Sequence, residues 1–370
     1  MPPLRLCYTF FEMMNLDNQE KLNELAAPLL KWYDAHRRPL PWREKISPYR
    51  TWVSEIMLQQ TRVSAVIPYF QRFMEAFPTV QALADADMEE LMKLWEGLGY
   101  YSRARNLQKA AQVIVSQYGG VFPNTYEALT ALPGIGDYTA GAILSIAFSQ
   151  RVPALDGNVL RLASRITGSR LDVLDGKNRR VFRAAMAEAM PPERCGAYNQ
   201  ALMDLGAMVC LPNGEPLCEE CPAKEFCQAR KENCQRELPV RQKKKEKRVE
   251  QKTVFLLLRG DEVALRQRAD AGLLAGLWEY PHVEGHLDEA DAAVQLKEWG
   301  IVPHRWLKKI SFKHEFTHIR WEMLGYVLQV QGDGSAHWIW ADSKLRRQRA
   351  VPSAFEKLTR EITDDGTALF

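Results

Sequence analysis

The sequence has no hydrophobic run long enough to cross a bilayer, because its longest apolar stretch covers only residues 140–148. The N-terminal segment MPPLRLCYTFFEMMNLDNQ contains one early arginine, a broken apolar region and no small-residue cleavage site, so we expect no secretory signal. Seven cysteines, an odd number, make a disulfide framework unexpected in such a chain. These absences argue against a membrane-embedded or secreted disulfide-rich protein, and we expect a cytoplasmic protein without membrane contact.

The sequence also lacks a strong charge bias: 49 Lys and Arg residues against 46 Asp and Glu residues leave a net charge of +3. Net charge therefore gives only weak support for a nucleic-acid partner. Apolar residues make up 46% of the 370 residues and charged residues 26%, which is typical of a folded protein with two domains. The densest basic run, RQKKKEKR at 241–248, has no apolar residues and suggests a solvated linker.

Residue periodicity divides the chain into four parts. Residues 1–15 form an N-terminal extension of unknown role, and 16–235 carry apolar residues at three- and four-residue spacing, which predicts an all-α domain. After a basic linker at 236–252, β-type runs and one helical segment predict an α+β domain over 253–370. The helices expected in the first domain are 23–36, 52–73, 88–95, 103–118 and 138–148. In the second domain we expect strands at 253–258, 262–266, 324–330 and 337–341, and a helix at 288–299.

Four of the cysteines form one compact group with the spacing Cys-x7-Cys-x2-Cys-x5-Cys: Cys210, Cys218, Cys221 and Cys227. Four thiols within one short loop strongly indicate a metal centre, since thiolates bind soft and borderline metals. The spacing alone does not separate zinc from an iron–sulfur cluster.

Two further features can carry chemistry. The stretch LPGIGD at 132–137 lies between helical segments, and Gly134 and Gly136 allow a tight turn whose backbone amides can bind a phosphate. Glu55 lies among apolar residues of the helix expected at 52–73, where burial would raise its pKa and keep it protonated at neutral pH. Asp156 precedes a glycine in the loop ALDGN, where aspartate is usually a turn or cap residue. A protonated acid paired with a carboxylate suits the hydrolysis of a glycosidic bond.

These motifs, in this order, resemble those of the MutY family of adenine DNA glycosylases over about residues 20–365. The match includes PWR and WVSEIMLQQTRV before residue 64, GLGYYSRARNL at 97–107, LPGIGDYTAGAILSIAF at 132–148, the four-cysteine loop, GLLAGLWEYP at 272–281 and HEFTH at 314–318. The first cysteine gap, LPNGEPL, is one residue longer than is usual in the family. The resemblance implies a multi-domain fold: an all-α helix–hairpin–helix glycosylase domain followed by an α+β MutT/Nudix-like domain. The helix–hairpin–helix is expected at about 126–148 and an iron–sulfur loop at 210–227.

The implied activity is removal of adenine mispaired with 8-oxoguanine, or more weakly with guanine, from double-stranded DNA by a monomer with one [4Fe–4S] cluster. In that family's reaction, Glu55 protonates adenine N7 and later activates water, and Asp156 stabilises the oxocarbenium-like sugar. By the same resemblance Tyr138 hydrogen-bonds near this centre, and Asn158 orients Glu55 or the water. The residues implied in the adenine pocket are Arg38, Leu40, Trp42, Arg43, Asn199 and Gln200.

The base to be removed is buried inside duplex DNA, so such a reaction also requires base flipping. The resemblance makes Gln60 the wedge that fills the vacated space and places Tyr100 against 8-oxoguanine. In the second domain, Thr317 stands where the family usually has serine and keeps the hydroxyl that can bond N7–H of the oxidised base. The residues implied in DNA contact are Gln60, Thr61, Tyr100, Gly134 and Gly136. Those implied in 8-oxoguanine recognition are Phe316, Thr317 and His318.

Three other functions agree less well with the sequence. An endonuclease III-like pyrimidine glycosylase-lyase would need a lysine at the position of Tyr138, because a phenol cannot form a Schiff base. A Nudix pyrophosphohydrolase would need several helix glutamates, and the corresponding AVQLKE at 293–298 keeps only Glu298. A non-catalytic iron–sulfur DNA-binding protein has no use for the carboxylates of Glu55 and Asp156. We therefore favour a monofunctional adenine glycosylase whose DNA binding weakens with salt.

Overall fold

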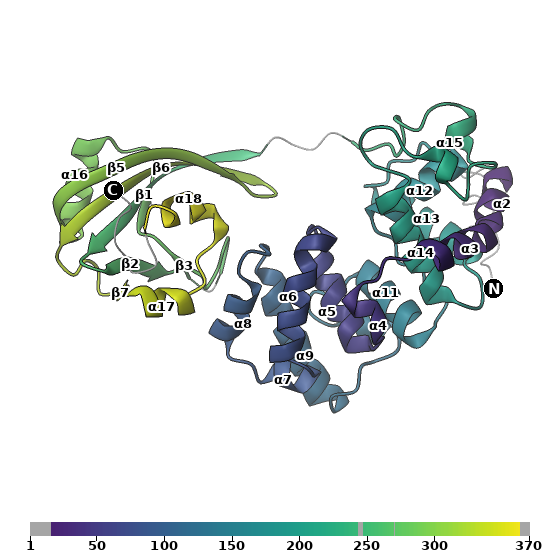
Figure 1. The fold of residues 1–370 in the computed structure, drawn as a ribbon, viewed down its shortest axis with the longest axis horizontal. Coiled ribbons are helices and arrows are strands. Elements are labelled where there is room, and N and C mark those ends of the chain that lie inside the picture. The colour runs from purple at the N-terminus through teal and green to yellow at the C-terminus, as the bar shows by residue number, and fades with distance from the viewer. Residues whose placement is uncertain (1–15, 243–246, 270, 363–370) are drawn as a thin grey trace, which may run out of the picture. The chain divides into compact units, whose positions relative to one another are not determined.

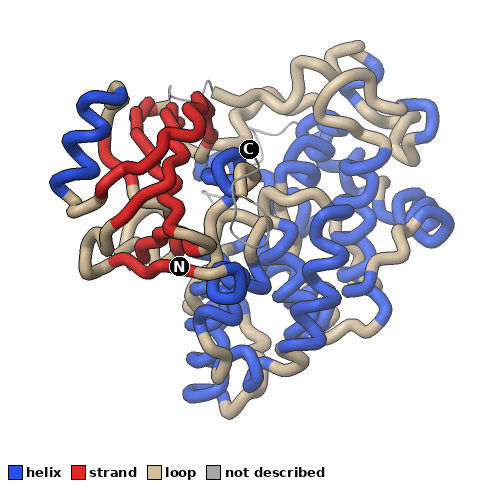
Figure 2. The backbone as a smooth tube through the Cα atoms, turned by 60° about the vertical axis from the view of Figure 1, so that its left-hand side comes forward, coloured by secondary structure: helices blue, strands red, loops and turns tan. Residues whose placement is uncertain are grey.

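The computed structural model describes residues 16–242, 247–269 and 271–362, so the extension expected at 1–15 lies outside the described residues. The chain divides into two compact units. Unit 1 is Met1–Ala84 with Asn106–Lys243, and unit 2 is Asp85–Arg105 with Lys244–Phe370. The described part of unit 1 is helical, and all described strands belong to unit 2 (Figures 1 and 2). This confirms the predicted fold class, an all-α domain followed by an α+β domain.

The helices of unit 1 begin at residues that favour helix starts. Ser47 caps α5 (Pro48–Leu58) by accepting a hydrogen bond from the Arg50 amide, and Pro48 occupies the first turn, where no helical amide bond is needed. Asp175 caps α13 (Gly176–Ala189) in the same way. Further helices of unit 1 are α2 (Leu16–Glu24), α3 (Ala26–His36), α4 (Pro41–Glu44), α6 (Val63–Ala76), α7 (Val80–Ala84), α10 (Tyr126–Thr130), α11 (Asp137–Phe148), α12 (Gly157–Thr167), α14 (Cys195–Met208) and α15 (Gln228–Lys231).

Helix α11 of unit 1 is largely buried and packs against α5 and α14. Gly141 of α11 lets the loop that precedes α12 approach closely, since a Cβ there would lie 2.5 Å from the Pro153 carbonyl oxygen. The single helix expected at 52–73 is in fact two helices, α5 and α6. Gln60 lies between them with a φ of +57°, a left-handed conformation that ends the first helix without proline or glycine. Among the described residues, no helix is both long enough and apolar enough to span a membrane.

Unit 2 is built on a seven-stranded mixed sheet with the path β3-β2-β1-β6-β5. The long strands β1 (Arg248–Arg259) and β6 (Ile319–Gln331) run parallel, and β5 (Val302–Glu315) pairs antiparallel with β6. The expected hairpin joins β1 to β2 (Glu262–Gln267). The short strands complete the sheet: β3 (Trp278–Glu279) and β7 (Trp338–Ala341) pair with β2, and β4 (His282–Glu284) pairs with β1.

Alternate residues of β1 face two different hydrophobic clusters, as the two-residue period of a strand requires. Val254 and Leu256 pack in one cluster with Phe355 of the C-terminal turn η2 (Ser353–Phe355), next to α18 (Glu356–Thr359). Phe255 and Leu257 pack in the other cluster with Ala292 and Leu296 of α16 (Glu289–Glu298). This buried double-faced strand explains the uninterrupted apolar run TVFLLL.

The structure differs from the expected boundaries in three places. Strand β1 begins at Arg248, inside the segment expected to be a linker at 236–252. Strand β5 was not expected from the sequence. Residues 85–105, which we placed in the helical domain, group with unit 2: the Glu89 carboxylate of α8 (Met88–Trp95) pairs with Arg349, and Glu96 accepts a hydrogen bond of 2.9 Å from the Val351 amide. The long helix α9 (Ser102–Tyr118) continues from this segment into unit 1.

Candidate active site

A cavity of about 620 Å³ in unit 1 brings together nine of the ten residues that we expected in the catalytic centre and the adenine pocket. Its walls come from α4, α5, the two ends of α11, the start of α12 and α14. Its size and its converging polar groups are those of a small-molecule or base pocket. The sequence-predicted residues that line it are Arg38, Leu40, Trp42, Arg43, Glu55, Gln60, Thr61, Tyr138, Asp156, Asn158 and Gln200.

Glu55 occupies a dry position in this cavity. It lies on α5, where its residue is only 5% exposed, and the hydroxyl of Tyr138 donates a hydrogen bond of 2.5 Å to its Oε2. Burial raises the pKa of Glu55 to about 7; the charge of Asp156 also raises it, whereas the Tyr138 hydrogen bond and the charge of Arg43 lower it. A large fraction of Glu55 is therefore protonated at neutral pH, as its apolar sequence context predicted.

Asp156 lies at the N-cap of α12 and is solvated by protein groups instead of water. Its Oδ1 accepts hydrogen bonds from the backbone amides of Asn158 and Val159 at 2.8 and 2.7 Å, and its Oδ2 accepts one of 2.8 Å from the Asn158 side chain. Burial raises the pKa of Asp156, and these three donors oppose that rise. Asp156 therefore serves both as the N-cap of α12 and as a residue of the cavity, because the backbone amides at the start of α12 point at its carboxylate.

Asn158 contacts Asp156 and not Glu55. Its amide nitrogen donates to Asp156, and its amide oxygen accepts a hydrogen bond of 2.9 Å from Arg161. Gly206 of α14 lets the two helices approach here, since a Cβ at that position would lie 2.6 Å from the Asn158 Cβ. The orienting role expected for Asn158 therefore applies, in the described structure, to Asp156.

A buried aspartate holds two arginines of the cavity wall. Asp204 on α14 is fully buried and accepts hydrogen bonds from two arginines that line the cavity. Arg38 reaches it at 2.6 and 2.9 Å, and Arg43 at 2.7 and 3.0 Å. Gln200 is held less firmly, because its oxygen accepts from the Tyr33 hydroxyl and its nitrogen donates to the Gly196 carbonyl, both at 3.3 Å.

Asn199 is placed differently from the expectation. It is fully buried beside the cavity wall but does not line the cavity. Its nitrogen donates to the Ser145 hydroxyl at 2.7 Å and to the Val152 carbonyl at 3.0 Å, and its oxygen accepts from the Ala154 amide at 3.2 Å. With both ends of the amide engaged, Asn199 supports the loop before Asp156 and has little capacity left to read a base edge.

The predicted helix–hairpin–helix forms as α10, a turn and α11. Gly134 in the turn has a φ of +77°, and a Cβ there would lie 2.8 Å from the Asn106 Cβ, so only glycine fits. Gly136 is the N-cap of α11. The Tyr126 hydroxyl donates a hydrogen bond of 2.6 Å to Asp137, which also pairs with Arg183, so the turn is anchored at the start of α11.

The four clustered cysteines line a small cavity of their own in unit 1. Cys210 follows α14, Cys218 starts the turn η1 (Cys218–Glu220), and Cys227 is the N-cap of α15. Burial, followed by the charges of the neighbouring thiols, raises the pKa of Cys221 to about 12, so four thiolates need a bound cation to exist together. Arg165 donates to Cys210 Sγ at 3.2 Å, and Lys224 and Arg230 also line the cavity.

In the described part of the chain, no three Cys, His, Asp or Glu side chains form a group that could hold a metal ion. The thiols nevertheless surround one space, with positively charged side chains that would offset the negative charge of a thiolate-bound cluster.

In unit 2, the residues implied in 8-oxoguanine recognition form the turn between β5 and β6. Phe316 closes the turn by donating its amide to the Ile319 carbonyl at 2.8 Å and packs edge-on to Trp321, with ring centroids 4.9 Å apart. Thr317 and His318 are exposed. The Thr317 hydroxyl donates to the Tyr100 hydroxyl at 3.2 Å, so two residues more than two hundred positions apart meet within unit 2.

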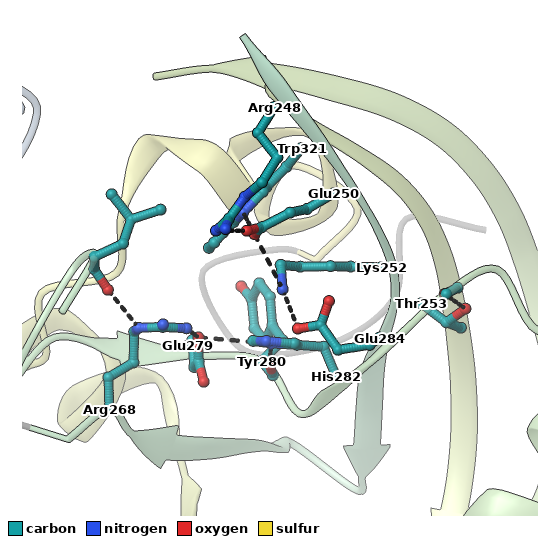
Figure 3. Close-up of polar contacts among 12 residues, drawn as sticks. Arg248, Glu250, Lys252, Thr253, Arg268, Glu279, Tyr280, His282, Glu284 and Trp321 are labelled. Carbon is teal, nitrogen blue, oxygen red and sulfur yellow. Dashed lines mark hydrogen bonds and ion pairs between the residues drawn. The ribbon is translucent and has the colours of Figure 1, made fainter. Parts of the chain in front are cut away.

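A buried polar cluster fixes the ring that supports this turn (Figure 3). The indole N–H of Trp321 donates to Glu250 at 2.9 Å, and the Lys252 ammonium lies 4.9 Å from the Trp321 ring centroid. Lys252 in turn pairs with Glu284. Burial and the nearby cations lower the pKa of His282 to about 3, so this histidine is neutral and adds no charge. Phe316 therefore rests on a rigid support.

The comparisons with known proteins agree with this architecture. A model of the HhH-GPD superfamily of base excision DNA repair proteins matches residues 53–190, and a NUDIX domain model matches residues 253–361. The chain is 34% identical to the adenine DNA glycosylase of Homo sapiens, over 90% of this chain and 72% of the relative. It is 35% identical to the adenine DNA glycosylase of Buchnera aphidicola subsp. Baizongia pistaciae, over 78% and 80%.

The chain belongs to the adenine DNA glycosylase family. It is an adenine-specific DNA N-glycosylase of base excision repair, with a Nudix-like second domain.

Solved structures place the helical unit of this adenine DNA glycosylase in a wider fold group. A thermostable thymine-DNA glycosylase aligns with a TM-score of 0.54 and 27% identity, over 58% of this chain and 98% of the other. A non-covalent endonuclease III–DNA complex aligns with a TM-score of 0.50 and 23% identity, over 58% and 97%, and that likeness concerns the fold alone.

Among the residues that sequence reasoning missed at this adenine DNA glycosylase's cavity are Met203 and, bound to the lining arginines, Asp204. Met203 lines the cavity and lies 3.7 Å from the Tyr138 hydroxyl, but nothing distinguishes Met203 from a core methionine in the sequence. Asp204 was detectable, because an aspartate inside the apolar helix segment ALMDLGAM must be paired if it is buried.

Proposed function

We propose that this adenine DNA glycosylase flips adenine out of A·8-oxoguanine and A·G mispairs in double-stranded DNA and hydrolyses its N-glycosidic bond, leaving an abasic site. The observation that carries the proposal is the pairing of Glu55, whose pKa is raised to about 7, with the protein-solvated carboxylate of Asp156 in one cavity. A protonated acid beside an ionised carboxylate is what departure of a purine and formation of a sugar cation require.

The proton belongs on Glu55 because the two carboxyls have different partners. Asp156 accepts three hydrogen bonds at the N-terminus of a helix, which favours its anion. Glu55 accepts one hydrogen bond, from Tyr138, and is almost fully buried. Like charges in a dry site cannot both ionise easily, so the better-solvated Asp156 carries the charge and Glu55 keeps the proton.

The reaction follows from this division. Glu55 donates its proton to N7 of the flipped adenine, which makes the base a neutral leaving group, and the C1′–N9 bond breaks with its electron pair going to the base. The Asp156 carboxylate stabilises the oxocarbenium-like sugar electrostatically. Glu55, now ionised, accepts a proton from the water that attacks C1′. Tyr138 cannot form a Schiff base with the sugar, so the strand stays intact.

The cavity wall supports adenine recognition. Arg38 and Arg43 are fixed by Asp204, and Leu40 and Trp42 offer apolar surface to the flat base. The Gln200 amide can hydrogen-bond an adenine edge, since its existing bonds are long. Gln60, exposed and in a left-handed conformation next to the catalytic helix, suits the role of the wedge in the duplex.

Recognition of the opposite base rests on unit 2. The Thr317 and Tyr100 hydroxyls meet on an exposed surface, which places a hydroxyl and an aromatic ring together for contact with 8-oxoguanine. A hydroxyl can accept a hydrogen bond from N7–H, which the oxidised base has and guanine lacks.

We assign the four-cysteine cavity to one [4Fe–4S] cluster held by Cys210, Cys218, Cys221 and Cys227. When bound, the cluster supplies structural bracing and no redox step. Its four ligands would tie residues 210–227 together, and Arg165 of α12 contacts one of them, Cys210. We further propose that the enzyme acts as a monomer in the cytoplasm, on DNA and without membrane contact.

The test is single-turnover cleavage of end-labelled duplexes that contain A·8-oxoguanine, A·G, A·T or an oxidised pyrimidine. Wild type and Glu55→Gln are compared, each with and without hot alkali. We expect strand breaks at A·8-oxoguanine, fewer at A·G, only after alkali, and none with Glu55→Gln. Breaks at the oxidised pyrimidine without alkali, or no break at A·8-oxoguanine, would refute the proposal.

A further inference from the structure

A second cavity of about 620 Å³ in unit 1 has no role in the reaction described so far. It is formed by the end of α3, by α4, by the C-terminal part of α11 and by the first turns of α14. Exposed residues, among them Arg37, Glu44, Ile46 and Arg194, line it, so it opens to solvent. Its volume is that of a site for a small organic molecule.

The second cavity shares a wall with the catalytic cavity. Five residues line both spaces: Arg38, Leu40, Arg43, Ile146 and Gln200. Four of these are the residues to which we assigned adenine contact. The position proposed for the excised base is therefore separated from the second cavity by side chains that the base itself would touch.

One residue of the shared wall is held only weakly. Arg38 and Arg43 are fixed through Asp204 by hydrogen bonds of 2.6–3.0 Å. Gln200 has only two bonds of 3.3 Å, to Tyr33 and to the Gly196 carbonyl. Rotation of the Gln200 side chain breaks only these two long hydrogen bonds and needs no backbone motion.

Bound DNA makes such a connection useful. The front of the catalytic cavity carries Gln60 and Thr61, which we assigned to DNA contact, so the duplex covers that opening during the reaction. A base cut free there leaves either after the DNA dissociates or through another opening. The second cavity offers apolar surface from Leu40 and Ile146 and the Tyr33 ring, over which the Arg43 guanidinium lies at 5.7 Å from the centroid. Flat uncharged purines suit such surfaces.

We propose that free adenine leaves the enzyme through this second cavity while the abasic DNA is still bound. The inference rests on the adenine excision proposed above, and on the Gln200 side chain acting as the gate. Release of the base then does not wait for release of the DNA.

The test uses a duplex with tritium-labelled adenine opposite 8-oxoguanine, attached to beads and saturated with enzyme. Three quantities are followed in time: alkali-sensitive strands on the beads, tritium in the supernatant and enzyme in the supernatant. For the wild type we expect tritium to appear at least about tenfold faster than enzyme, since product DNA release is slow in many such reactions.

The blocking variant is Ala197→Phe, which fills the second cavity from α14 at a residue that does not line the catalytic cavity. We expect its bond cleavage to be unchanged and its tritium to appear only together with enzyme, while the control Ala197→Ser behaves as the wild type. The second blocking variant, Ile46→Trp, changes a rim side chain that is 52% exposed and decides the matter if Ala197→Phe does not fold. Ile46→Val is its control.

Tritium that leaves with the enzyme in the wild type overturns the proposal, as does a fast release that neither blocking variant slows. Failure of the proposed excision would look different, because no alkali-sensitive strand would form in any variant.

Discussion

Replacing Asp204 by asparagine tests whether the cavity wall depends on one buried charge. Asp204 is fully buried and accepts four hydrogen bonds from the guanidinium groups of Arg38 and Arg43, whose side chains are 25% and 13% exposed. Removing one partner of a buried ion pair costs about 3–5 kcal/mol, since the remaining charges stay uncompensated. Because Arg38 retains some solvent contact, we expect Asp204→Asn to lower the free energy of unfolding by about 3 kcal/mol.

The matched control is Asp34→Asn. Asp34 also binds an arginine through both carboxylate oxygens, at 2.5 and 3.1 Å to Arg194, but both side chains are about half exposed. Exposed pairs contribute little because water and salt screen them. We therefore expect a much smaller loss for Asp34→Asn than for Asp204→Asn.

Urea unfolding followed by helical circular dichroism measures both variants, with the midpoint as the readout and an unchanged slope as the condition for comparison. Single-turnover excision supplies the functional side: Asp204→Asn slows excision while abasic-site DNA still binds, because the wall around the base loosens and the DNA contacts remain. Equal midpoints for the two variants would refute the argument from burial.

Three further predictions address the acid, the lesion contact and the cluster. Tyr138→Phe removes a hydrogen bond that lowers the pKa of Glu55, so the alkaline limb of the excision rate should move to higher pH, and a move to lower pH would contradict the assignment. Thr317→Val removes one hydroxyl and should reduce the preference for A·8-oxoguanine over A·G about tenfold, whereas Thr317→Ser should keep it. Cys221→Ser should abolish bound iron and acid-labile sulfide in the purified protein; iron content equal to wild type, or stoichiometric zinc in the wild type, would contradict a [4Fe–4S] centre.

The sequence predicted those elements whose side chains report burial directly. The helix at 88–95 matches α8, and the helix expected at 288–299 matches α16 together with its N-cap Asp288 and C-cap Trp299. Strand β5 escaped prediction because most of its residues are exposed or half-buried and two irregularities interrupt its register, so the alternating pattern is faint. The first four residues of β1, RVEQ, are exposed or half-buried, since backbone pairing with β6 and not side-chain burial holds them in the strand.

The site was predictable where a residue is chemically out of place, as a glutamate is in an apolar helix. Glu55 lies where the motif put it, and Asp156 keeps both the cap role and the cavity position. Asn199 shows the limit: the neighbouring amides of Asn199 and Gln200 look equivalent in sequence, but helix geometry turns one into the core and the other to the cavity. The meeting of Tyr100 with Thr317 depends on residues 85–105 packing in unit 2, which no local pattern records.

The pH dependence of single-turnover excision by the wild type tests the central claim most directly. Glu55 works as a protonated acid, and its raised pKa means that the active form is complete at low pH and is lost as the pH rises through about 7. Bound DNA adds negative charge, so the limb in the complex lies at or above that value, and the rate should fall about tenfold per pH unit beyond it. A rate constant that stays level to about two pH units above 7 would contradict Glu55 as the proton donor.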